Sequence, residues 1–331
     1  MIESLLLFSL YGTITRNFFD CCGDNMTDLS IIIVSWNVCD LLRDCLASIH
    51  ADDLDIQVIV VDSASSDDSV RMVREEFPHV TLLPQAENIG YTRGNNVGFE
   101  AATGRYHLLL NPDTVILGDT LQQMVTYMDD NPDVGIIGPH TLNTDGTHQS
   151  TRRRFPTPIL AFFESTWLQG LAPRKMLDRF NVRDIDDNAI ADVDWVQGSA
   201  LMARQDVYAK IGGLDTNFVM FSEELDWCKR AKDAGWRVVY MGNVQIIHHG
   251  GASTQQVVAR KHIYFQESKL RYFRKHHGAL MAWILRLFLL ASYLWQIGIE
   301  GIKSLLGSKR DLRRERIRAY WQVIRSGLKV T

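Results

Sequence analysis

Short apolar runs alternate with helix-like segments over the first part of the chain, and this alternation constrains the fold more than any other feature. Five runs are apolar or β-branched and too short for a helix, which predicts buried strands. They are residues 29–36, 56–62, 80–84, 105–110 and 134–138. Because strands that alternate with helices form a mostly parallel sheet with right-handed crossovers, the sequence predicts an α/β fold.

The fourth predicted strand leads into the sequence HLLLNPDT, residues 107–114. Asn111 and Pro112 end the apolar run, so Asp113 lies just beyond the end of a strand. Ligands of open α/β sheets bind outside the carboxyl ends of the strands, which places Asp113 where it can meet a ligand or its metal ion. The alternative is that Asp113 only begins a turn or caps a following helix.

After residue 139 the alternating pattern weakens and then resumes. We expect an excursion over the ligand face of the sheet at 140–192 with a helix at 159–180, a strand at 193–203, a helix at 221–235 and a strand at 237–249. The pattern therefore predicts that the second half of the chain completes the same sheet.

Composition narrows the class of protein. A chain of 331 residues that is 46% hydrophobic can bury a large core, and a formal net charge of -4 gives no signal for nucleic acid binding. The five cysteines form no paired CxxC set, which favours a reduced compartment. Residues 1–25 resemble nothing that follows, and we expect a loosely attached extension, with Met26 as an alternative start.

The C-terminal region, 256–331, is predicted to be helical, amphipathic and basic. Residues 279–301 are almost wholly apolar, interrupted only by Arg286, Gln296 and Glu300, and a Lys/Arg-rich tail follows. Holding Arg286 at a membrane centre would cost about 2.5 to 3.5 kcal/mol. We therefore favour an element that lies in the membrane surface. The alternatives are packing on the sheet-based domain or on a second subunit, which gives a homodimer, and a true membrane span.

Seven motifs between residues 29 and 253 occur in an order and spacing that resemble the family 2 glycosyltransferases, particularly bacterial rhamnosyltransferases. They are IIIVSWN (31–37), VVDSASSDDS (60–69), ENIGYTRGNNVG (87–98), LLLNPDT (108–114), DWVQGSALMARQDVYAKIGGLDTNF (194–218), SEELDWCKRAKDAG (222–235) and IIHHGGAS (246–253). The resemblance implies a GT-A fold at 26–255, with a nucleotide-binding half at 26–139 and an acceptor and catalytic half at 140–255.

The resemblance also implies a nucleotide-diphosphate sugar donor and a divalent metal ion, Mg²⁺ or Mn²⁺. Asp113 and His248 are the implied metal ligands, and the first acidic position of the family's metal motif is Asn111 here. Asp62 ends a strand where its carboxylate can accept from a pyrimidine ring, or it can merely cap its own turn. The expected donor-binding residues are Asp62, Asn88, Arg93, Asn95, Asn111 and Asp113, of which 88, 93 and 95 belong to a glycine-rich loop.

Inversion at the sugar carbon needs one base that deprotonates the acceptor hydroxyl. The resemblance places this role in an acidic pair, Glu223 and Glu224, and we choose Glu224. Alternatively, Ser222 and both glutamates only cap the helix that they begin. The expected acceptor and sugar pocket contains Trp195, Gln197, Gly198, Ser199 and Asp226, although Trp195 also suits a core. Residues 152–154, three arginines, suit a phosphate contact or a solvated charge run.

These residues imply an inverting transferase that uses dTDP-rhamnose and a lipid-linked or polysaccharide acceptor. We expect it at the cytoplasmic face of the cell membrane as a peripheral protein. The alternatives are another UDP-, GDP- or dTDP-sugar, and a non-catalytic sugar-nucleotide-binding protein, which the departure at Asn111 would suit. A nucleotidyltransferase would need a glycine-rich triphosphate loop near the first strand, and SWNVCDLL (35–42) is not one.

Overall fold

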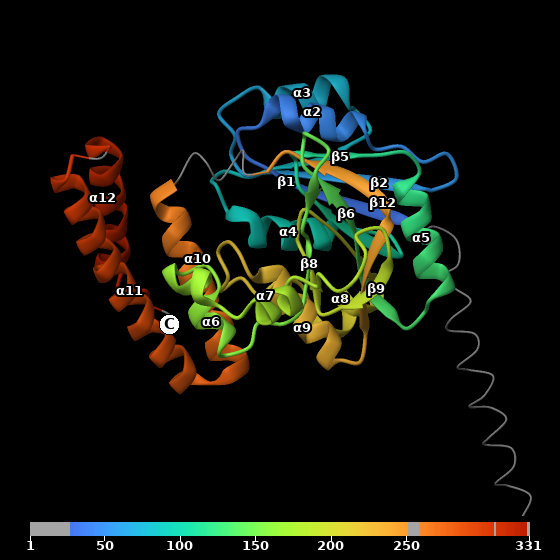
Figure 1. Ribbon diagram of the computed structural model, residues 1–331. Coiled ribbons are helices and arrows are strands. Elements are labelled where there is room, and N and C mark those ends of the chain that lie inside the picture. Colours follow the sequence, from blue (N-terminus) through green and yellow to red (C-terminus); the bar gives the residue numbers. More distant parts are fainter. Residues whose placement is uncertain (1–26, 251–257, 308, 330–331) are drawn as a thin grey trace, which may run out of the picture.

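The computed structural model describes residues 27–250, 258–307 and 309–329 (Figure 1). The predicted N-terminal extension, 1–25, lies outside the described residues. An α/β unit and a group of C-terminal helices lie side by side, as Figure 1 shows. The predicted combination of a sheet-based domain and a helical C-terminal region is therefore confirmed.

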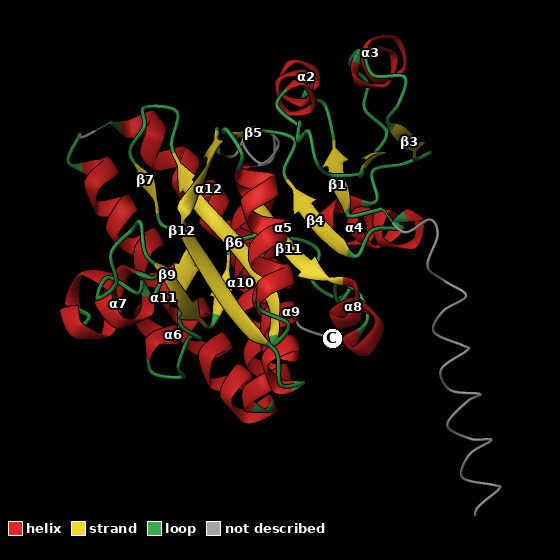
Figure 2. Cartoon of the chain, turned by 90° about the vertical axis from the view of Figure 1, so that its right-hand side faces the viewer, coloured by secondary structure: helices red, strands yellow, loops and turns green. Residues whose placement is uncertain are grey.

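A ten-stranded sheet forms the centre of the α/β unit (Figure 2). Its order is β3-β2-β1-β4-β11-β6-β12-β5, with β7 beside β6 and β9 beside β12, while β8 pairs with β10 separately. The strands are β1 (Leu29–Ser35), β2 (Ile56–Asp62), β3 (Thr81–Pro84), β4 (Tyr106–Leu110), β5 (Thr114–Ile116), β6 (Val134–Leu142), β7 (His148–Gln149), β8 (Arg152–Arg153), β9 (Ile190–Val193), β10 (Trp195–Val196), β11 (Ala200–Arg204) and β12 (Arg237–His248).

The first four strands of that order are parallel to one another, as predicted. β11 then enters antiparallel between β4 and β6, and β5 and β9 pair antiparallel with β12. The five strands predicted up to residue 138 are all present. The sequence prediction missed β5, β7 and β8, because two or three residues are too few to show a period.

The helices cover both faces of the sheet and build the C-terminal region. They are α2 (Cys39–Ala47), α3 (Ser69–Glu76), α4 (Gly90–Ala101), α5 (Thr120–Asp130), α6 (Leu160–Phe163), the 3-10 helix η1 (Trp167–Leu171), α7 (Arg174–Phe180), α8 (Gln205–Ile211), α9 (Glu223–Asp233), α10 (Val258–His277), α11 (Ala279–Leu305) and α12 (Arg310–Ser326). The single helix expected at 159–180 is thus three short elements. The strand expected at 193–203 is likewise interrupted between β9, β10 and β11.

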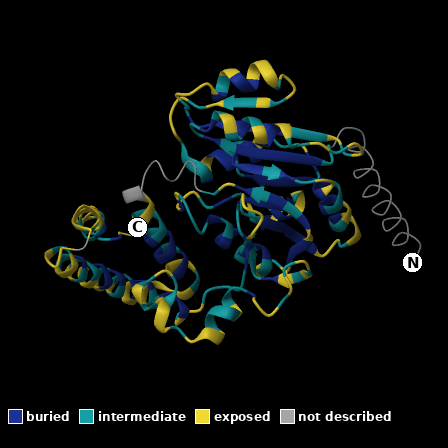
Figure 3. Ribbon diagram, turned by 45° about the horizontal axis from the view of Figure 1, so that its top comes forward, coloured by how far each residue is buried: buried dark blue, intermediate teal, exposed yellow. Residues whose placement is uncertain are grey.

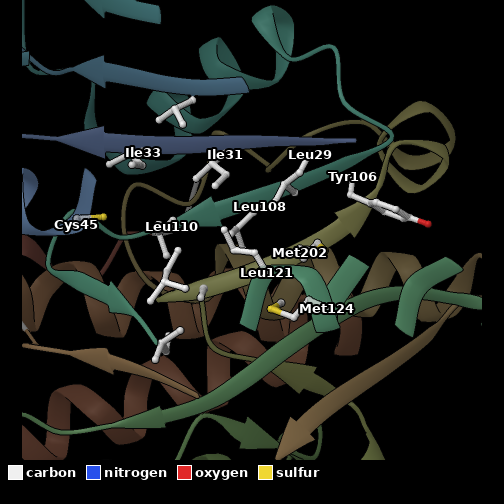
Figure 4. Packing of buried hydrophobic residues seen from close by; sticks show 14 of the residues in the cluster. Leu29, Ile31, Ile33, Cys45, Tyr106, Leu108, Leu110, Leu121, Met124 and Met202 are labelled. Atoms are coloured by element: carbon white, nitrogen blue, oxygen red, sulfur yellow. The ribbon is translucent and has the colours of Figure 1, made fainter. Parts of the chain in front are cut away.

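The core lies on both faces of the sheet, because the central strands carry apolar side chains in both directions. Along β1, Ile31 and Ile33 belong to the cluster shown in Figure 4, which also contains residues of α2 and α5. Ile32 points the other way, into a second cluster under α4 and α9. This burial fixes the register of β1, because a shift by one residue would exchange the two faces.

The glycine-rich segment expected to be a loop is the helix α4 itself. A Cβ atom at Gly94 would lie 2.7 Å from Val34, and one at Gly98 would lie 2.2 Å from Ile32. These glycines therefore let α4 pack directly onto β1. Arg93 and Asn95 consequently lie on a helix rather than in a loop, which corrects the sequence prediction.

The C-terminal helices form a third hydrophobic cluster that joins them to the α/β unit. Leu285, Leu289 and Tyr293 of α11 are buried in it together with Phe218 and Leu225, which flank and begin α9. Figure 3 shows that the outer side of these helices is largely exposed. Within the described residues, α11 is the one helix long and apolar enough to cross a membrane.

We predict that Gly98→Ala destabilises the fold by about 1 to 3 kcal/mol, because the new Cβ would overlap the fully buried Ile32. Gly298→Ala is the matched control. It is also a helical glycine, but its Cβ would meet nothing within 4 Å, so it should stabilise the protein by up to about 1 kcal/mol. Urea unfolding midpoints measure both, and equal effects of the two substitutions would contradict the tight contact between α4 and β1.

Candidate active site

The end of β4 and the end of β12 bring Asp113 and His248 together. Thr114 of β5 pairs with His248 of β12, and the backbone N–H of His249 donates to the carbonyl of Asp113 (2.9 Å). This pairing sets Asp113 Oδ1 3.2 Å from His248 Nε2, with both side chains almost completely buried. Asp113 and His248, which the resemblance implies as metal ligands, therefore lie side by side in the structure.

The two side chains fit a divalent metal ion. Gln149 Oε1 lies 2.7 Å from His248 Nδ1, so Nδ1 carries the proton and Nε2 presents a lone pair. Asn111 Nδ2 lies 3.3 Å from Nε2. A carboxylate oxygen and an imidazole lone pair that face each other across 3.2 Å suit a cation. The described residues contain no group of three or more His, Cys, Asp or Glu side chains arranged for a metal, so the protein would supply two ligands.

The acidic pair begins α9 after a strained turn. Phe221 (φ 70°) and Ser222 (φ 64°) both have left-handed backbone, which costs about 1 to 3 kcal/mol for a residue other than glycine. Ser222 makes no side-chain cap, so the alternative that Ser222 caps this helix is wrong. Two strained residues directly before Glu223 and Glu224 are typical of a functional site.

Glu223 is buried and Glu224 is half-buried, and their environment favours the protonated form. Burial raises the pKa of Glu224, and it raises that of Glu223 well above its usual value, with the charge of Glu224 adding to the shift. Backbone N–H groups, including that of Gly198, oppose the shift at Glu224. Glu223 Oε2 and Glu224 Oε2 find no hydrogen-bond partner among the described residues. A buried carboxylate with an unbonded oxygen can accept a proton from a substrate.

Tyr91 joins the two parts of the site, and the sequence analysis missed it. This residue of the first turn of α4 donates its hydroxyl to the carbonyl of Gly198 (3.0 Å). Burial raises the pKa of Tyr91 well above its usual value, and the charges of Glu223, Glu224 and Asp113 act in the same direction. The helix α4 thus brings a phenol to Gly198, beside Glu224, where the charges of both carboxylate sites act on it. The sequence signal that could have identified Tyr91 is its position inside the motif at 87–98.

The other expected donor residues divide into two groups. Asp62 is buried at the end of β2, where Oδ2 accepts from the N–H of Ser65 (2.9 Å) and Oδ1 has no partner among the described residues. It therefore caps its turn and still offers one oxygen. Asn88 accepts from the N–H of Gly90, and Arg93 is exposed on α4. Asn95 is buried and donates to the carbonyl of Tyr91 (2.9 Å), so it supports the helix rather than a ligand.

The segment before β11 lies beside the acidic pair. A Cβ at Gly198 would lie 3.7 Å from Glu224, and the carbonyl of Ser199 accepts from the N–H of Asn111 (3.0 Å). Trp195 packs against two hydrophobic clusters and donates its Nε1 to the carbonyl of Arg154 (3.1 Å). The backbone N–H of Gln197 donates to the carbonyl of Thr151. Gly198 and Ser199 therefore lie at the site, whereas Trp195 has the core role left open above.

Asp226 was expected in the acceptor pocket, and the structure corrects this prediction. Its carboxylate is fully buried and bonds Arg230 (2.9 Å), Lys275 (2.9 Å) and His276 (2.8 Å). Despite burial, the hydrogen bonds from His276 and Lys275 and the charge of Arg230 hold the pKa of Asp226 at about 2. Asp226 thus ties α9 to α10 and does not face a substrate.

Arg152 was expected to contact a phosphate or to belong to a solvated charge run, and the structure corrects this prediction. Its guanidinium is buried, bonds Asp187 (2.7 Å) and the carbonyl of Ile185 (2.7 Å), and stacks on Tyr240. Arg153 donates to Ser150 Oγ (2.6 Å), and burial lowers its pKa to about 10. Neither side chain is a solvated charge, and both hold the excursion of residues 150–187 in place.

The sequence matches known families and proteins. Residues 30–189 match the family described as glycosyl transferase family 2. The N-acetylglucosaminyl-diphospho-decaprenol L-rhamnosyltransferase of Mycobacterium tuberculosis is 24% identical over 310 residues, which cover 88% of this chain and 97% of the relative. The rhamnosyltransferase WbbL of Escherichia coli K12 is 24% identical over 252 residues, which cover 73% of this chain and 91% of the relative.

The fold also matches a solved structure, that of the mannosyltransferase PcManGT from Pyrobaculum calidifontis in complex with GDP-Man and Mn²⁺. The TM-score is 0.53 at 18% identity, and the match covers 92% of this chain and 86% of the other. The predicted GT-A fold is therefore confirmed.

We predict that Glu224→Gln raises the melting temperature at pH 8 but not near pH 4. A carboxyl whose pKa is raised in the folded state contributes its stability below its unfolded pKa, about 4.3, and loses it as the pH rises through the folded value. Glutamine carries no such charge, so the difference in melting temperature between the variant and the wild type should widen as the pH rises.

Asp226→Asn is the opposite control. Its folded pKa is lowered, so its contribution is present above the unfolded value of about 3.9 and is lost as the pH falls toward 2. This variant should therefore melt below the wild type at neutral pH. A Glu224→Gln protein that is less stable than the wild type at pH 8 would show that Glu224 is a structural cap.

Proposed function

We propose that this chain, which is a family 2 glycosyltransferase, transfers L-rhamnose from dTDP-rhamnose with inversion onto a lipid-linked or polysaccharide acceptor of the cell envelope. The observation that carries the proposal is that one short segment, Gly198 and Ser199, lies against both carboxylate sites. The carbonyl of Ser199 accepts from the N–H of Asn111 (3.0 Å), two residues before Asp113, and a Cβ at Gly198 would lie 3.7 Å from Glu224. The two rhamnosyltransferase relatives support the choice of sugar.

Donor binding is assigned to the edge of the sheet where β2 and β4 end. The oxygen of Asp62 that its own turn leaves unbonded can accept the ring N–H of a pyrimidine. Asp113 and His248 would hold the metal ion, which neutralises the developing charge of the diphosphate leaving group when it is bound. The Mn²⁺ of the mannosyltransferase complex supports this assignment. Asn111 lies beside this pair, with its Nδ2 3.3 Å from His248 Nε2, at the position where the family has a second carboxylate.

Glu224 is the proposed base. The acceptor hydroxyl must lose its proton as its oxygen attacks the sugar carbon from the face opposite the diphosphate. The carboxylate of Glu224 lies in a buried environment that raises its pKa toward the range useful for a base. Gly198 permits this position because a side chain there would approach Glu224 and the Tyr91 hydroxyl. Glu223, whose pKa is raised further, would remain protonated beside it.

The exposed face of α11 supports a location at a membrane surface. We call it the apolar face, and it consists of Leu280, Trp283, Ile284, Leu287, Leu294, Trp295, Ile302 and Leu305. Two charged residues of this helix turn inward, since Arg286 donates to the carbonyl of Gly327 (2.7 Å) and Glu300 pairs with Arg313 (2.6 Å). Trp167 of η1 extends the face, with its ring 6.2 Å from that of Trp295.

The basic helix α12 complements this face. Arg310, Arg314 and Arg318 are exposed on it, and each would add about 1 kcal/mol of attraction to an anionic membrane. Because the inner side of α11 packs onto the catalytic unit, the proposal is a peripheral association at the cytoplasmic face rather than a span.

We predict that the purified protein slowly releases dTDP from dTDP-rhamnose in the presence of Mn²⁺ or Mg²⁺, and that EDTA or Asp113→Ala abolishes the release. UDP- and GDP-sugars in the same panel test the choice of donor. Asp178→Ala is the matched control, since this carboxylate pairs only with surface arginines. Release from a UDP- or GDP-sugar instead would overturn the choice of rhamnose, and donor binding without release would favour the non-catalytic alternative.

We predict that the protein floats with vesicles that contain phosphatidylglycerol, and that Leu287→Glu abolishes flotation because it puts a charge at the centre of the apolar face. Ile190→Glu is the matched control, an exposed apolar residue of β9. High salt should weaken binding of the wild type. If Leu287→Glu changes a dimer into a monomer in light scattering and leaves flotation intact, the apolar face is a subunit interface.

A further inference from the structure

His248 is held by a residue that no part of the proposed function includes. Gln149, in the two-residue strand β7, accepts from His248 Nδ1 through its Oε1 at 2.7 Å. β7 pairs with the end of β6, with Gln149 opposite Thr141. The hairpin between β6 and β7 therefore delivers a side chain to the far side of the imidazole from Asp113.

The orientation of the Gln149 amide is fixed by a chain of hydrogen bonds in the same hairpin. Gln149 Nε2 donates to Asn143 Oδ1 (2.9 Å), and Asn143 Nδ2 donates to Thr147 Oγ1 (2.9 Å). The Thr147 hydroxyl in turn lies 2.6 Å from Asp145 Oδ1. In both Gln149 and Asn143, the amide nitrogen bonds one neighbouring residue of this chain of hydrogen bonds, and the amide oxygen bonds the other.

Asp145 gives the chain a single direction. Its hydrogen bonds from the hydroxyl and the backbone N–H of Thr147 hold the pKa of this carboxyl below its usual value, so it only accepts. Thr147 must then donate to Asp145 and accept from Asn143. Asn143 must accept from Gln149, and Gln149 must present its oxygen to His248. In the reverse order, Thr147 would donate to Asn143, and its oxygen would face Asp145 Oδ1 at 2.6 Å with no proton between the two acceptors.

We propose that Gln149 is a positioning residue that keeps the His248 proton on Nδ1, so that the Nε2 lone pair faces Asp113 Oδ1 at 3.2 Å. The binding of a metal ion at that position rests on the proposed function, whereas the inferred tautomer of His248 does not. The opposite tautomer would leave Nδ1 without a proton, so that two acceptors, Nδ1 and Gln149 Oε1, would face each other at 2.7 Å. The β6–β7 hairpin contributes none of the proposed residues that bind the sugar donor, yet it would orient His248, one of the two metal ligands.

The test uses the full-length, metal-free protein labelled with ¹⁵N, in which long-range proton–nitrogen spectra report the tautomer of His248. His248→Gln assigns the signal. We expect the Nδ1–H form in the wild type, a mixture in Gln149→Ala, and retention in Gln149→Glu, whose oxygen still accepts. Asp145→Asn, an exposed hairpin residue remote from the site, should also give a mixture because its amide can donate, and it serves if Gln149→Ala does not fold.

A second arm measures Mn²⁺ binding in the presence of dTDP by electron paramagnetic resonance. Loss of an outer residue that orients a ligand typically weakens metal affinity by about 10- to 100-fold, so we expect that loss in Gln149→Ala and near wild-type affinity in Gln149→Glu. Gln85→Ala is the control, since within the described residues this side-chain amide bonds only the carbonyl of Leu83 (3.1 Å). An unchanged tautomer in Gln149→Ala would overturn the inference. A changed tautomer with no Mn²⁺ binding in any protein would uphold it and overturn the metal part of the proposed function.

Discussion

The antiparallel pairing of β5 with β12 is the contact on which the site depends. β5 has only three residues, yet its register sets Thr114 opposite His248 and Ile116 opposite Ile246. The buried side chain of Ile116 and the bond between the N–H of His249 and the carbonyl of Asp113 hold this register. A shift by one residue would turn His248 to the other face of the sheet and separate it from Asp113. One short strand thus joins residues that lie far apart in the sequence.

The acidic pair is held in an unfavourable state by the packing around it. Two left-handed residues precede it, and burial of two neighbouring carboxyl groups opposes their ionisation. The rest of α9 offsets these costs. Trp227 and Cys228 are fully buried in the core, and Asp226 pairs with Lys275 and His276 of α10. The C-terminal helices therefore support the catalytic helix as well as the proposed membrane face.

The sequence predicted the parts of the fold that repeat. Apolar runs with a strand-like length gave β1, β2, β4 and β6, and a carboxylate after such a run gave Asp113. The errors have a physical pattern. The glycines of α4 looked like a loop because their close packing on β1 becomes visible only when the sheet is built. Asp226 and Arg152 looked like ligand contacts because a charged side chain shows its partners, Lys275 or Asp187, only after folding.

Gln149 and Tyr91 were missed for the same reason, since their roles depend on His248 and Gly198, which lie about a hundred residues away in the chain. The choice of sugar stays a prediction, because no described contact selects rhamnose.

The measurement that tests the central claim most directly is a comparison of Glu224→Gln with the wild type, by calorimetric titration of the sugar nucleotide and by the rate of its turnover. The account predicts that the variant binds the donor with wild-type affinity while its turnover falls by about 100- to 10,000-fold, the contribution of a positioned base. Turnover close to that of the wild type, in a variant that binds the donor equally well, would contradict it.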